Sequence, residues 1–397
     1  MRTITVITVA RSDYGIYLPV LRAIQADPDL CLRLIVAGSH LVPELGLTRS
    51  VIESDGFTIA EQIEMVLASD TPTGTALSMG LGLIGFAQSY ARVRPDLLLV
   101  LGDRFEMYAA TLAALPFRMP VAHIHGGEIT AGAIDDALRH SITKLSHLHF
   151  VAMEAYRRRV IQLGEEPWRV LVSGAPSLDY IKTFVPLGKD ELGDRLGLSL
   201  AQPPLLVTYH PVTLEYEDTG WQVGELLQAL DQTRLSVIFT APNADSGGHL
   251  VTQMITQFCA SHPMAHVVAN VGTEGYLSLM THAAAMVGNS SSGIIEAPSF
   301  KLPVVNIGTR QKGRARAPNI IDVGYTCAEI RHGIAQALRP SFRDALVGME
   351  NPYGDGNAGQ RIVERLKTVA LDQRLITKHF YDLTSAVPLT GAEVHDQ

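Results

Sequence analysis

The sequence has few of the features that mark secreted, metal-binding or membrane proteins. It contains only three cysteines in 397 residues, Cys31, Cys259 and Cys327, and no CxxC pair. Cysteines this far apart exclude a zinc ribbon and a disulfide framework and are typical of a reducing compartment. No apolar run approaches the roughly 20 residues that a membrane-spanning helix needs. We therefore predict a cytoplasmic protein that does not act in a membrane.

Positive charge is also scarce. The 32 lysines and arginines are outnumbered by 40 acidic residues, which gives a net charge of −8. A negative overall field disfavours nucleic acid and anionic membranes as partners, although a local arginine cluster can still hold a phosphate. The first polar turn, residues 11–15, is neither a GxGxxG nor a Walker loop. Neither NAD nor a P-loop nucleotide is therefore indicated.

Apolar segments of strand length alternate with helical patterns along the chain. Such alternation predicts parallel, doubly wound sheets with right-handed crossovers. With 47% hydrophobic residues, a chain of this length has material for two cores. The predicted strands are 3–10, 32–37, 57–62, 97–101, 120–124, 148–153, 170–173, 205–209, 235–240, 285–288 and 303–307.

A change of composition divides the chain. Residues 184–204 contain three prolines and several charges but no strand pattern, so we interpret them as a connection between domains. The predicted fold is α/β, with two Rossmann-like domains that face a central cleft. The expected division is an N-terminal domain at 1–183, a C-terminal domain at 205–371, and a tail at 372–397 that packs back on the first domain.

Candidate catalytic residues gather in the stretch 96–149, where two predicted strands end in polar turns and a third turn opens a helix. In open α/β sheets ligands bind at the carboxyl ends of the strands, where these side chains fall. A helix cap or a partner for a helix dipole also explains each residue singly, but their convergence favours a catalytic pocket. The candidates are Asp103, Arg104, His125, Glu128, Asp135 and Asp136.

A second group of residues is suited to a diphosphate. Arg11 stands beside a helix start, where free N–H groups and the helix dipole favour an anion. In the second half, Ser290 and Ser291 follow a strand and open a helix, and residues 310–316 supply four cations. A serine-rich helix cap is the alternative explanation. Glu296, one turn further on, is placed to accept hydrogen bonds from a ribose diol.

Ten motifs, in order along nearly the whole chain, resemble the hydrolysing UDP-N-acetylglucosamine 2-epimerases of sialic-acid biosynthesis. They are ARSDYG, GSH, LGDRFE, HIHGGE, DDALRHSITK, RVIQLGEEP, YHPVTL, NADSGG, GNSSSGIIE and GTRQKGR. The bacterial pattern is the nearest, because animal bifunctional enzymes and non-hydrolysing relatives carry a glutamate in place of His125. The resemblance implies a glycosyltransferase-B-like fold, a reaction without metal or cofactor, and a homodimer or homotetramer.

The resemblance also implies the chemistry and its residues. UDP leaves C1 as a proton leaves C2, which forms a glycal, and water then adds to give N-acetylmannosamine. Asp103, Glu128, Asp135 and Asp136 are the acid–base candidates, and the sequence leaves open which of them takes the C2 proton. The expected supporting roles are Arg104 to orient the carboxylates, His125 to face the sugar, Arg11, Ser290, Ser291 and Arg310 to bind the diphosphate, His210 to bind its sugar-side oxygens, Glu296 to bind the ribose and Asn243 to lie near the uridine.

Four other interpretations stay open at this point. A hydrolysing epimerase of the same family acts on UDP-2,4-diacetamido-2,4,6-trideoxyglucose in legionaminic-acid synthesis. A non-hydrolysing epimerase returns UDP-N-acetylmannosamine. A glycosyltransferase shares the two-domain cleft but needs an acceptor. A sugar-nucleotide sensor binds UDP without needing four acidic groups beside the sugar.

Overall fold

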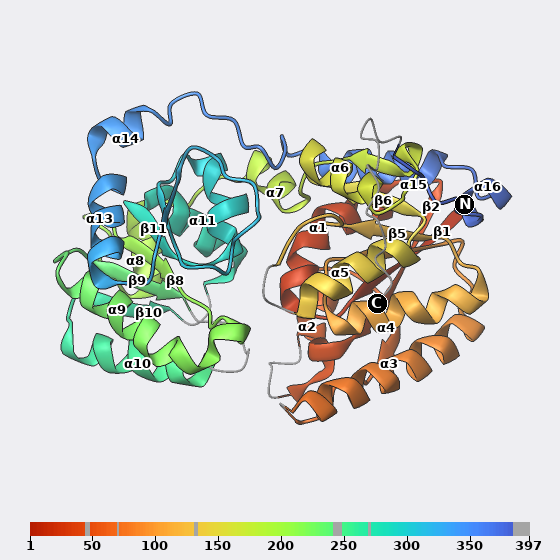
Figure 1. Cartoon of the computed structure of the whole chain (residues 1–397), viewed down its shortest axis with the longest axis horizontal. Coiled ribbons are helices and arrows are strands. Elements are labelled where there is room, and N and C mark those ends of the chain that lie inside the picture. The colour runs from red at the N-terminus through yellow and green to blue at the C-terminus, as the bar shows by residue number, and fades with distance from the viewer. Residues whose placement is uncertain (44–47, 70, 131–133, 241–247, 269–270, 384–397) are drawn as a thin grey trace, which may run out of the picture.

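The computed structural model describes residues 1–397 apart from 44–47, 70, 131–133, 241–247, 269–270 and 384–397. The described chain forms two α/β lobes that lie side by side (Figure 1), each built on one parallel sheet. We call the lobe with β1–β7 the first domain and the lobe with β8–β13 the second domain. The predicted fold class, two doubly wound domains, is confirmed. No helix in the described part of the chain is long and apolar enough to cross a membrane.

The first domain contains a seven-stranded sheet in the order β3-β2-β1-β4-β5-β6-β7, with every pairing parallel. Its strands are β1 (Arg2–Thr8), β2 (Leu30–Ala37), β3 (Ile59–Ile63), β4 (Leu97–Leu101), β5 (Val121–Ile124), β6 (Leu148–Val151) and β7 (Val170–Val172). Its helices are α1 (Arg11–Ala26), α2 (Arg49–Ser54), α3 (Pro72–Arg92), α4 (Phe105–Ala114), α5 (Ile134–Leu145), α6 (Glu154–Gln162) and α7 (Ser177–Thr183).

The second domain repeats this plan with six strands in the order β10-β9-β8-β11-β12-β13, again all parallel. Its strands are β8 (Leu205–Thr208), β9 (Val237–Thr240), β10 (Ala265–Val268), β11 (Ala285–Gly288), β12 (Val304–Ile307) and β13 (Ile320–Val323). Its helices are α8 (Lys189–Leu196), α9 (Thr219–Asp231), α10 (Gly248–Ser261), α11 (Gly272–His282), α12 (Ser291–Ile295), α13 (Cys327–Ala337) and α14 (Pro340–Asp344).

Both faces of each sheet are covered by helices. In β4, Leu97, Leu99 and Leu101 belong to one buried cluster, whereas Leu98 and Val100 belong to another. This two-residue alternation between clusters, in a strand with no polar residue, is typical of a central strand in a parallel sheet. The same arrangement explains why the sequence shows such strands as continuous apolar runs.

The strand orders locate where a ligand should bind. In each sheet the order reverses beside the first strand, between β1 and β4 in the first domain and between β8 and β11 in the second. Ligands of doubly wound sheets bind outside the carboxyl ends of strands at such a switch point. The turns after β4, β5, β8 and β11 carry most of the predicted site residues.

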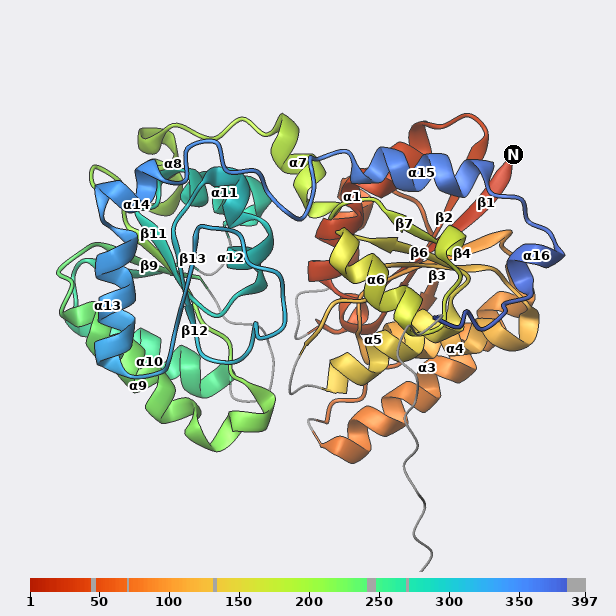
Figure 2. The ribbon, with the colours of Figure 1, turned by 45° about the horizontal axis from the view of Figure 1, so that its top comes forward.

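The predicted connection at 184–204 is wrong in one respect, because most of this segment packs on the second domain. Leu192 and Leu200 are buried in one cluster with Leu206, which lies in β8. Charges and prolines hide this packing in the sequence, since few apolar residues are enough to seat a short helix. The chain instead crosses between the domains near α7, which lies between the two lobes (Figure 2).

The return to the first domain begins earlier than residue 372. Helix α15 (Ala358–Thr368), which the sequence assigned to the second domain, packs against α1 through Ile362, Val363 and Leu366. Helix α16 (Gln373–Ile376) follows it, and both lie over the first domain in the two views of the chain. Within the predicted tail, Leu375 is buried in a core cluster of the first domain. Residues 384–397 lie outside the described part, so the prediction for the whole tail stays a prediction.

The close approach of β11 to β8 depends on Gly288. Its φ is +135°, and a Cβ placed there would lie 1.9 Å from the carbonyl oxygen of Thr208. We expect Gly288→Ala to lower the free energy of unfolding by about 2 kcal/mol or more, because the new methyl group must displace a backbone oxygen. Chemical denaturation of the two proteins measures this difference.

Gly224→Ala is the matched control. Gly224 lies inside α9, and nothing lies within 4 Å of the position that its Cβ would take. Alanine in a helix interior is expected to leave stability unchanged or to raise it by about 0.5–1 kcal/mol. Equal destabilisation by the two substitutions would contradict the importance of the β8–β11 contact.

Candidate active site

Asp103 lies in the turn that follows β4 and forms an ion pair with Arg139 of α5. The same guanidinium donates through Nη1 to the carbonyl oxygen of His125 at 2.8 Å and through Nη2 to the hydroxyl of Thr130 at 3.1 Å. That hydroxyl donates in turn to the Asp103 carboxylate at 3.3 Å. Arg139 is buried and so fixes Asp103 and the turn after β5 relative to each other.

His125 and Glu128 form a second buried pair in the turn after β5. His125 adopts a left-handed φ of +64°, and its Nδ1 lies 2.6 Å from Glu128 Oε1. Burial by itself raises the pKa of the Glu128 carboxyl, but His125, through its charge and hydrogen bond, and the Arg314 and Arg139 charges bring that pKa well below its usual range. Glu128 is therefore an anion at neutral pH.

Asp136 joins the same cluster through Thr130. Its Oδ1 accepts the Thr130 backbone N–H at 2.8 Å, and its Oδ2 lies 3.7 Å from His140 Nε2 one turn along α5. Asp135 precedes it in the first turn of α5 and is half-buried. The structure thus brings Asp103 and Asp136 together through Arg139 and Thr130, neither of which we had predicted, and Glu128 joins them through His125, whose carbonyl oxygen accepts from Arg139.

Arg104 lies beside a carboxylate that we had not predicted. It precedes α4 and forms an ion pair with the buried Glu106, with Nε and Oε2 3.3 Å apart. Burial and then the Arg104 charge lower the pKa of His40, which follows β2, to about 4. The arginine that forms an ion pair with Asp103 is Arg139, and the role of Arg104 in orienting the carboxylates stays a prediction.

Arg11 is the exposed first residue of α1. The turn before it is held by the buried Asp13, whose carboxylate accepts the backbone N–H groups of Val9 at 2.9 Å and Ala10 at 2.6 Å. Burial raises the pKa of Asp13 to about 6 against the effect of these hydrogen bonds. Arg11 is thus carried by a fixed turn at the switch point of the first sheet.

Asn289 ties together the strand ends of the second domain. Its side chain accepts the backbone N–H of His210 and donates to the carbonyl oxygen of His210, both at 2.7 Å. Its own carbonyl oxygen accepts from Arg310 Nη1 at 3.0 Å and from Gln311 Nε2 at 2.9 Å. His210 and Arg310, predicted from distant stretches of sequence, are therefore connected through one buried asparagine.

Ser290 and Ser291 open α12 directly after Asn289. The Ser290 side chain accepts the backbone N–H of Ser292 at 3.3 Å and caps the helix. The capping alternative therefore describes Ser290 in this structure, while Arg310 lies over the same turn. Assignment of the two serines to a diphosphate remains a prediction.

His210 is expected to be uncharged at neutral pH. Burial, followed by the Arg310 charge, lowers the pKa of His210 from 6.5 to about 3. The stability that the neutral ring contributes is complete above pH 6.5 and is lost as the pH falls toward 3. We expect the NMR ring signals of His210 not to titrate between about pH 5 and pH 8 in the nucleotide-free protein. A midpoint close to 6.5 would contradict this.

Glu296, predicted to bind a ribose, ends α12 at the boundary between the domains. Its Oε1 accepts a hydrogen bond of 2.7 Å from the hydroxyl of Ser177, the first residue of α7. Burial raises the pKa of Glu296. Asn243, predicted near the uridine, lies outside the described residues.

A loop of the second domain, residues 309–316, reaches the carboxylate cluster of the first domain, which contains Asp103, Glu128 and Asp136. Arg314 Nη2 lies 3.6 Å from Glu128 Oε2. Next to it, the Ala315 N–H donates to the hydroxyl of Tyr156 at 3.3 Å, and the hydroxyl of Tyr353 donates to the Ala315 carbonyl oxygen at 3.1 Å. The sequence pattern placed Arg314 with a diphosphate, whereas the structure places it at a carboxylate.

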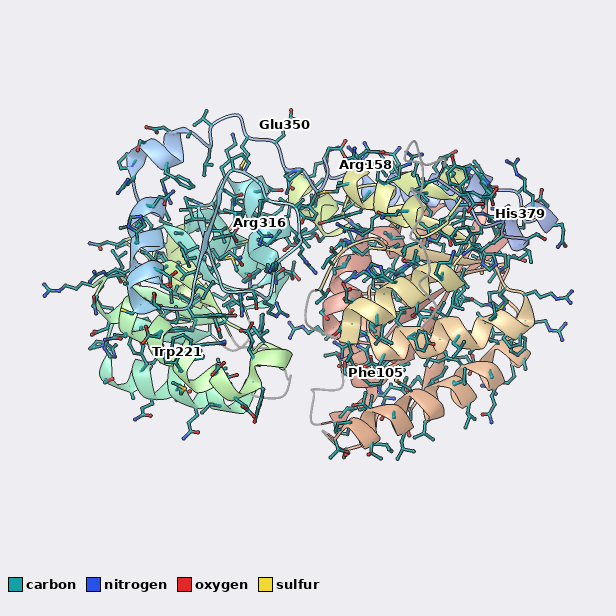
Figure 3. All side chains as sticks on the ribbon, viewed as in Figure 1. Phe105, Arg158, Trp221, Arg316, Glu350 and His379 are labelled. Carbon is teal, nitrogen blue, oxygen red and sulfur yellow. The ribbon has the colours of Figure 1, made fainter. Side chains whose placement is uncertain are left out.

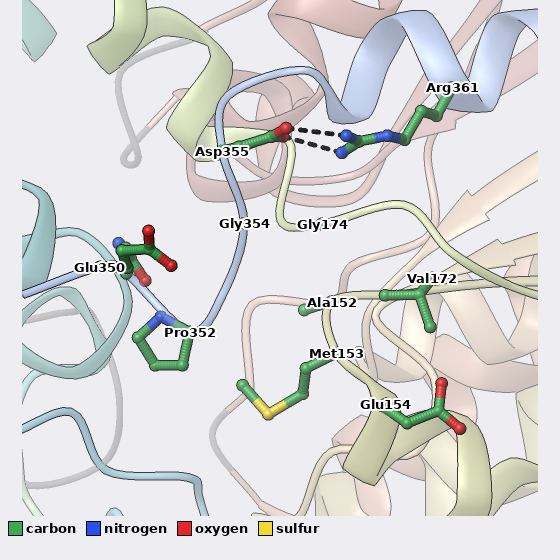
Figure 4. A pocket seen from close by; sticks show the side chains of 11 residues that line it. Ala152, Met153, Glu154, Val172, Gly174, Glu350, Pro352, Gly354, Asp355 and Arg361 are labelled. Carbon is green, nitrogen blue, oxygen red and sulfur yellow. Dashed lines mark hydrogen bonds and ion pairs between the residues drawn. The ribbon is translucent and has the colours of Figure 1, made fainter.

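A cavity lies away from these residues. It has a volume of about 730 Å³ and opens between the ends of β6 and β7 and the segment 350–355 that crosses between the domains (Figure 4). Asp355 and Arg361 form an ion pair of 2.8 Å at its edge. None of the predicted site residues lines it. No group of three or more His, Cys, Asp or Glu residues in the described chain could hold a metal ion.

A family model and the sequence relatives of this chain point to the same family. A family model described as UDP-N-acetylglucosamine 2-epimerase matches residues 22–367. The GDP/UDP-N,N'-diacetylbacillosamine 2-epimerase (hydrolyzing) of Campylobacter jejuni is 40% identical over 385 residues, which are 96% of this chain and 99% of the relative. The UDP-N,N'-diacetylbacillosamine 2-epimerase (hydrolyzing) of Legionella pneumophila is 38% identical over 379 residues, 95% and 99% of the two chains.

The fold is shared with solved structures of other proteins. The UDP-GlcNAc 2-epimerase of Neisseria meningitidis bound to UDP-GlcNAc matches with a TM-score of 0.75 and 19% identity. The match covers 92% of this chain and 99% of that one. At this identity the likeness shows the fold, with its two facing Rossmann-type domains.

Proposed function

The chain belongs to the UDP-N-acetylglucosamine 2-epimerase family, and on that premise we propose that it is a hydrolysing 2-epimerase of UDP-N,N'-diacetylbacillosamine, which is UDP-2,4-diacetamido-2,4,6-trideoxyglucose. The products are UDP and the free 2-epimer, 2,4-diacetamido-2,4,6-trideoxymannose. The observation that carries the proposal is the three-carboxylate cluster of the first domain, which lies against a cationic loop of the second. In such a site the carboxylates can transfer protons, and the cations can stabilise the negative charge of a departing anion.

The identity of the sugar is supported by the two bacterial relatives. Both are named as hydrolysing enzymes for the diacetamido sugar, at 40% and 38% identity over nearly the full chain. The sequence motifs by themselves favoured UDP-N-acetylglucosamine and a sialic-acid pathway, with the diacetamido sugar as the alternative. The relatives support that alternative better.

The proposed reaction has two halves. In the first, the C1–O bond to UDP breaks with its electron pair on the diphosphate, a carboxylate takes the proton from C2, and a C1–C2 double bond forms. In the second, water adds its oxygen to C1 while a proton returns to C2 from the opposite face. One water is consumed, and no electrons are exchanged with any other molecule.

The electrostatics of the cluster suggest different roles for its carboxylates. Because its pKa is held well below the usual range, Glu128 is a weak base. It is better suited to stabilise the positive charge that develops at C1. We assign proton removal from C2 to Asp103, which Arg139 and Thr130 hold in position. Arg310, at the other wall, receives the departing diphosphate.

UDP-N-acetylglucosamine is the second candidate substrate, because the family model that matches carries that name. Incubating the purified protein with each nucleotide sugar separately, in water enriched in ¹⁸O and in D₂O, tests both candidates. We expect faster release of UDP from the diacetamido sugar, with ¹⁸O on C1 and deuterium on C2 of the free product.

Other outcomes would exclude the proposal. A product that remains linked to UDP indicates a non-hydrolysing epimerase. Label on the UDP phosphate indicates cleavage of a P–O bond and rules out elimination. Faster turnover of UDP-N-acetylglucosamine selects the second candidate, and unchanged substrate after long incubation indicates a binding protein.

A further inference from the structure

Arg314 is the residue through which the second domain enters the carboxylate cluster. Its side chain is 11% exposed, and its Nη2 lies 3.6 Å from Glu128 Oε2. The other amino group, Nη1, is buried and has no hydrogen-bond partner among the described residues. A guanidinium that is buried at a carboxylate therefore keeps one end without an acceptor.

The loop holds this arginine in place from several sides. Arg316 donates through Nη1 to the carbonyl oxygens of Arg314 at 2.9 Å and Gln311 at 2.8 Å. Tyr156 and Tyr353 bind the N–H and the carbonyl oxygen of Ala315, the next residue. The backbone on the far side of Arg314 is thus fixed by side chains from both domains.

The residue before Arg314 also fits closely. Gly313 has a φ of +85°, and a Cβ there would lie 3.1 Å from Ile129, the neighbour of Glu128. The loop therefore passes directly against the turn that carries Glu128. The Arg314 side chain therefore has little freedom to move away from Glu128 and bind another partner.

An unpaired buried donor is unfavourable, so one that is held rigidly at a functional site suggests an acceptor that arrives with a ligand. The bound nucleotide sugar offers phosphate oxygens, ribose and uracil oxygens, and the oxygens of the sugar. In the second domain, Arg310 and Gln311 lie at the turn after β11, where both donate hydrogen bonds to the Asn289 carbonyl oxygen. Arg314 reaches beyond that turn to Glu128, where the sugar is acted on.

We propose that Arg314 is a substrate-binding residue of the acid–base site, in which Nη1 donates a hydrogen bond to a hydroxyl or acetamido oxygen of the sugar while Nη2 stays beside Glu128. This inference rests on the proposed function. It makes the site incomplete in either domain alone, because the arginine that binds the sugar and the carboxylates that act on it come from different lobes. The leaving nucleotide is held by other residues.

The test is Arg314→Gln, which removes the charge and keeps a polar side chain of intermediate length. We expect kcat/KM for the nucleotide sugar to fall by about 10- to 100-fold, the loss typical of one charged hydrogen bond. UDP affinity, measured by calorimetry, is expected to stay within about twofold, because UDP lacks the sugar. Weakened UDP binding of the same size would overturn the proposal and place Arg314 at the diphosphate. An unchanged kcat/KM would also overturn it.

Arg158→Gln is the matched control for loss of one positive charge. Arg158 is exposed on α6 of the first domain, whereas Arg316, two residues after Arg314 in the chain, lies in the second domain (Figure 3). We expect Arg158→Gln to leave kcat/KM unchanged. A fall equal to that in Arg314→Gln would show a general effect of charge and contradict the hydrogen bond.

Tyr353→Phe tests the proposal without removing the arginine, in case Arg314→Gln fails to fold. It deletes only the hydroxyl, which donates to Ala315 and lies 3.0 Å from the Tyr156 hydroxyl. We expect kcat/KM to fall by about 2- to 10-fold, the effect of losing these neutral hydrogen bonds, with UDP affinity unchanged. Full activity in this variant would show that the loop needs no support and would count against the proposal.

The proposed function and this inference fail separately. If the wild-type protein converts neither nucleotide sugar, the proposed function fails. Binding measurements on the same variants then test the role of Arg314. The quantity measured is the affinity for the intact nucleotide sugar divided by the affinity for UDP. We expect Arg314→Gln to reduce that ratio by about 10-fold or more, and an unchanged ratio would overturn the inference by itself.

Discussion

Asp103→Asn is expected to lower turnover by on the order of a hundredfold or more while leaving UDP affinity nearly unchanged, as loss of an acid–base group does. The amide has almost the same shape as the carboxylate and can still accept from Arg139 and Thr130. It cannot take a proton from carbon. The change therefore removes the proposed base and keeps most of the packing around it.

Asp96→Asn is the matched control. Asp96 stands at the opposite end of the same strand region, where its carboxylate accepts the backbone N–H of Thr3 at 2.7 Å. We expect normal turnover from this variant. Steady-state kinetics and UDP calorimetry on both proteins separate the effects. If Asp103→Asn weakened UDP binding as much as it slowed turnover, Asp103 would be a nucleotide-binding residue and the proposed base would have to be Asp136.

The fold could be predicted because its strands are buried on both faces. A strand such as β4, with five apolar residues, is recognisable without any partner, and the polar turn that follows marks its carboxyl end. The order of strands within each sheet could not be predicted from the sequence, because the apolar pattern of a strand does not show which other strand it pairs with. Since the switch points follow from that order, only the structure shows that β1 with β4 and β8 with β11 bracket the site.

Domain boundaries were harder to predict, because the composition of a segment does not show which hydrophobic core it packs against. Residues 184–204 have the charges and prolines of a linker, yet Leu192 is completely buried against the second sheet. Helix α15 shows a clear apolar stripe, but a stripe fits either domain equally well. Its contact with α1 comes from the course of the chain, which crosses back before residue 358.

The positions of candidate residues could be predicted where they stand at strand ends, as Asp103 and Glu128 do. Their contacts with residues from other elements were missed. Arg139 had a signal, because it lies three residues after Asp136 on one helix face. The Tyr156 and Tyr353 hydroxyls, 3.0 Å apart but 197 positions apart in sequence, had none. Pairing of this kind depends on how the two domains meet.

Arg310→Ala is expected to show the opposite pattern from Asp103→Asn. Arg310 binds the Asn289 carbonyl oxygen at the carboxyl end of β11, on the wall of the cleft that we assign to the diphosphate. Its loss should weaken UDP binding by about 1.5–3 kcal/mol, the range for a hydrogen bond to a charged group. The control is Arg331→Ala, at an exposed position of α13 in the same domain, where the arginine donates to Gln232. We expect this change to leave UDP binding unchanged.

Calorimetry with UDP measures the loss directly, and single-turnover kinetics at saturating nucleotide sugar measure the chemical step. Because Arg310 also helps to receive the leaving group, we expect the chemical step to slow as well, whereas in Asp103→Asn it slows without loss of affinity. Full UDP affinity in Arg310→Ala would mean that the diphosphate is held in the first domain, by the α1 turn at Arg11. The assignment of proton transfer to one domain and of the diphosphate to the other would then be wrong.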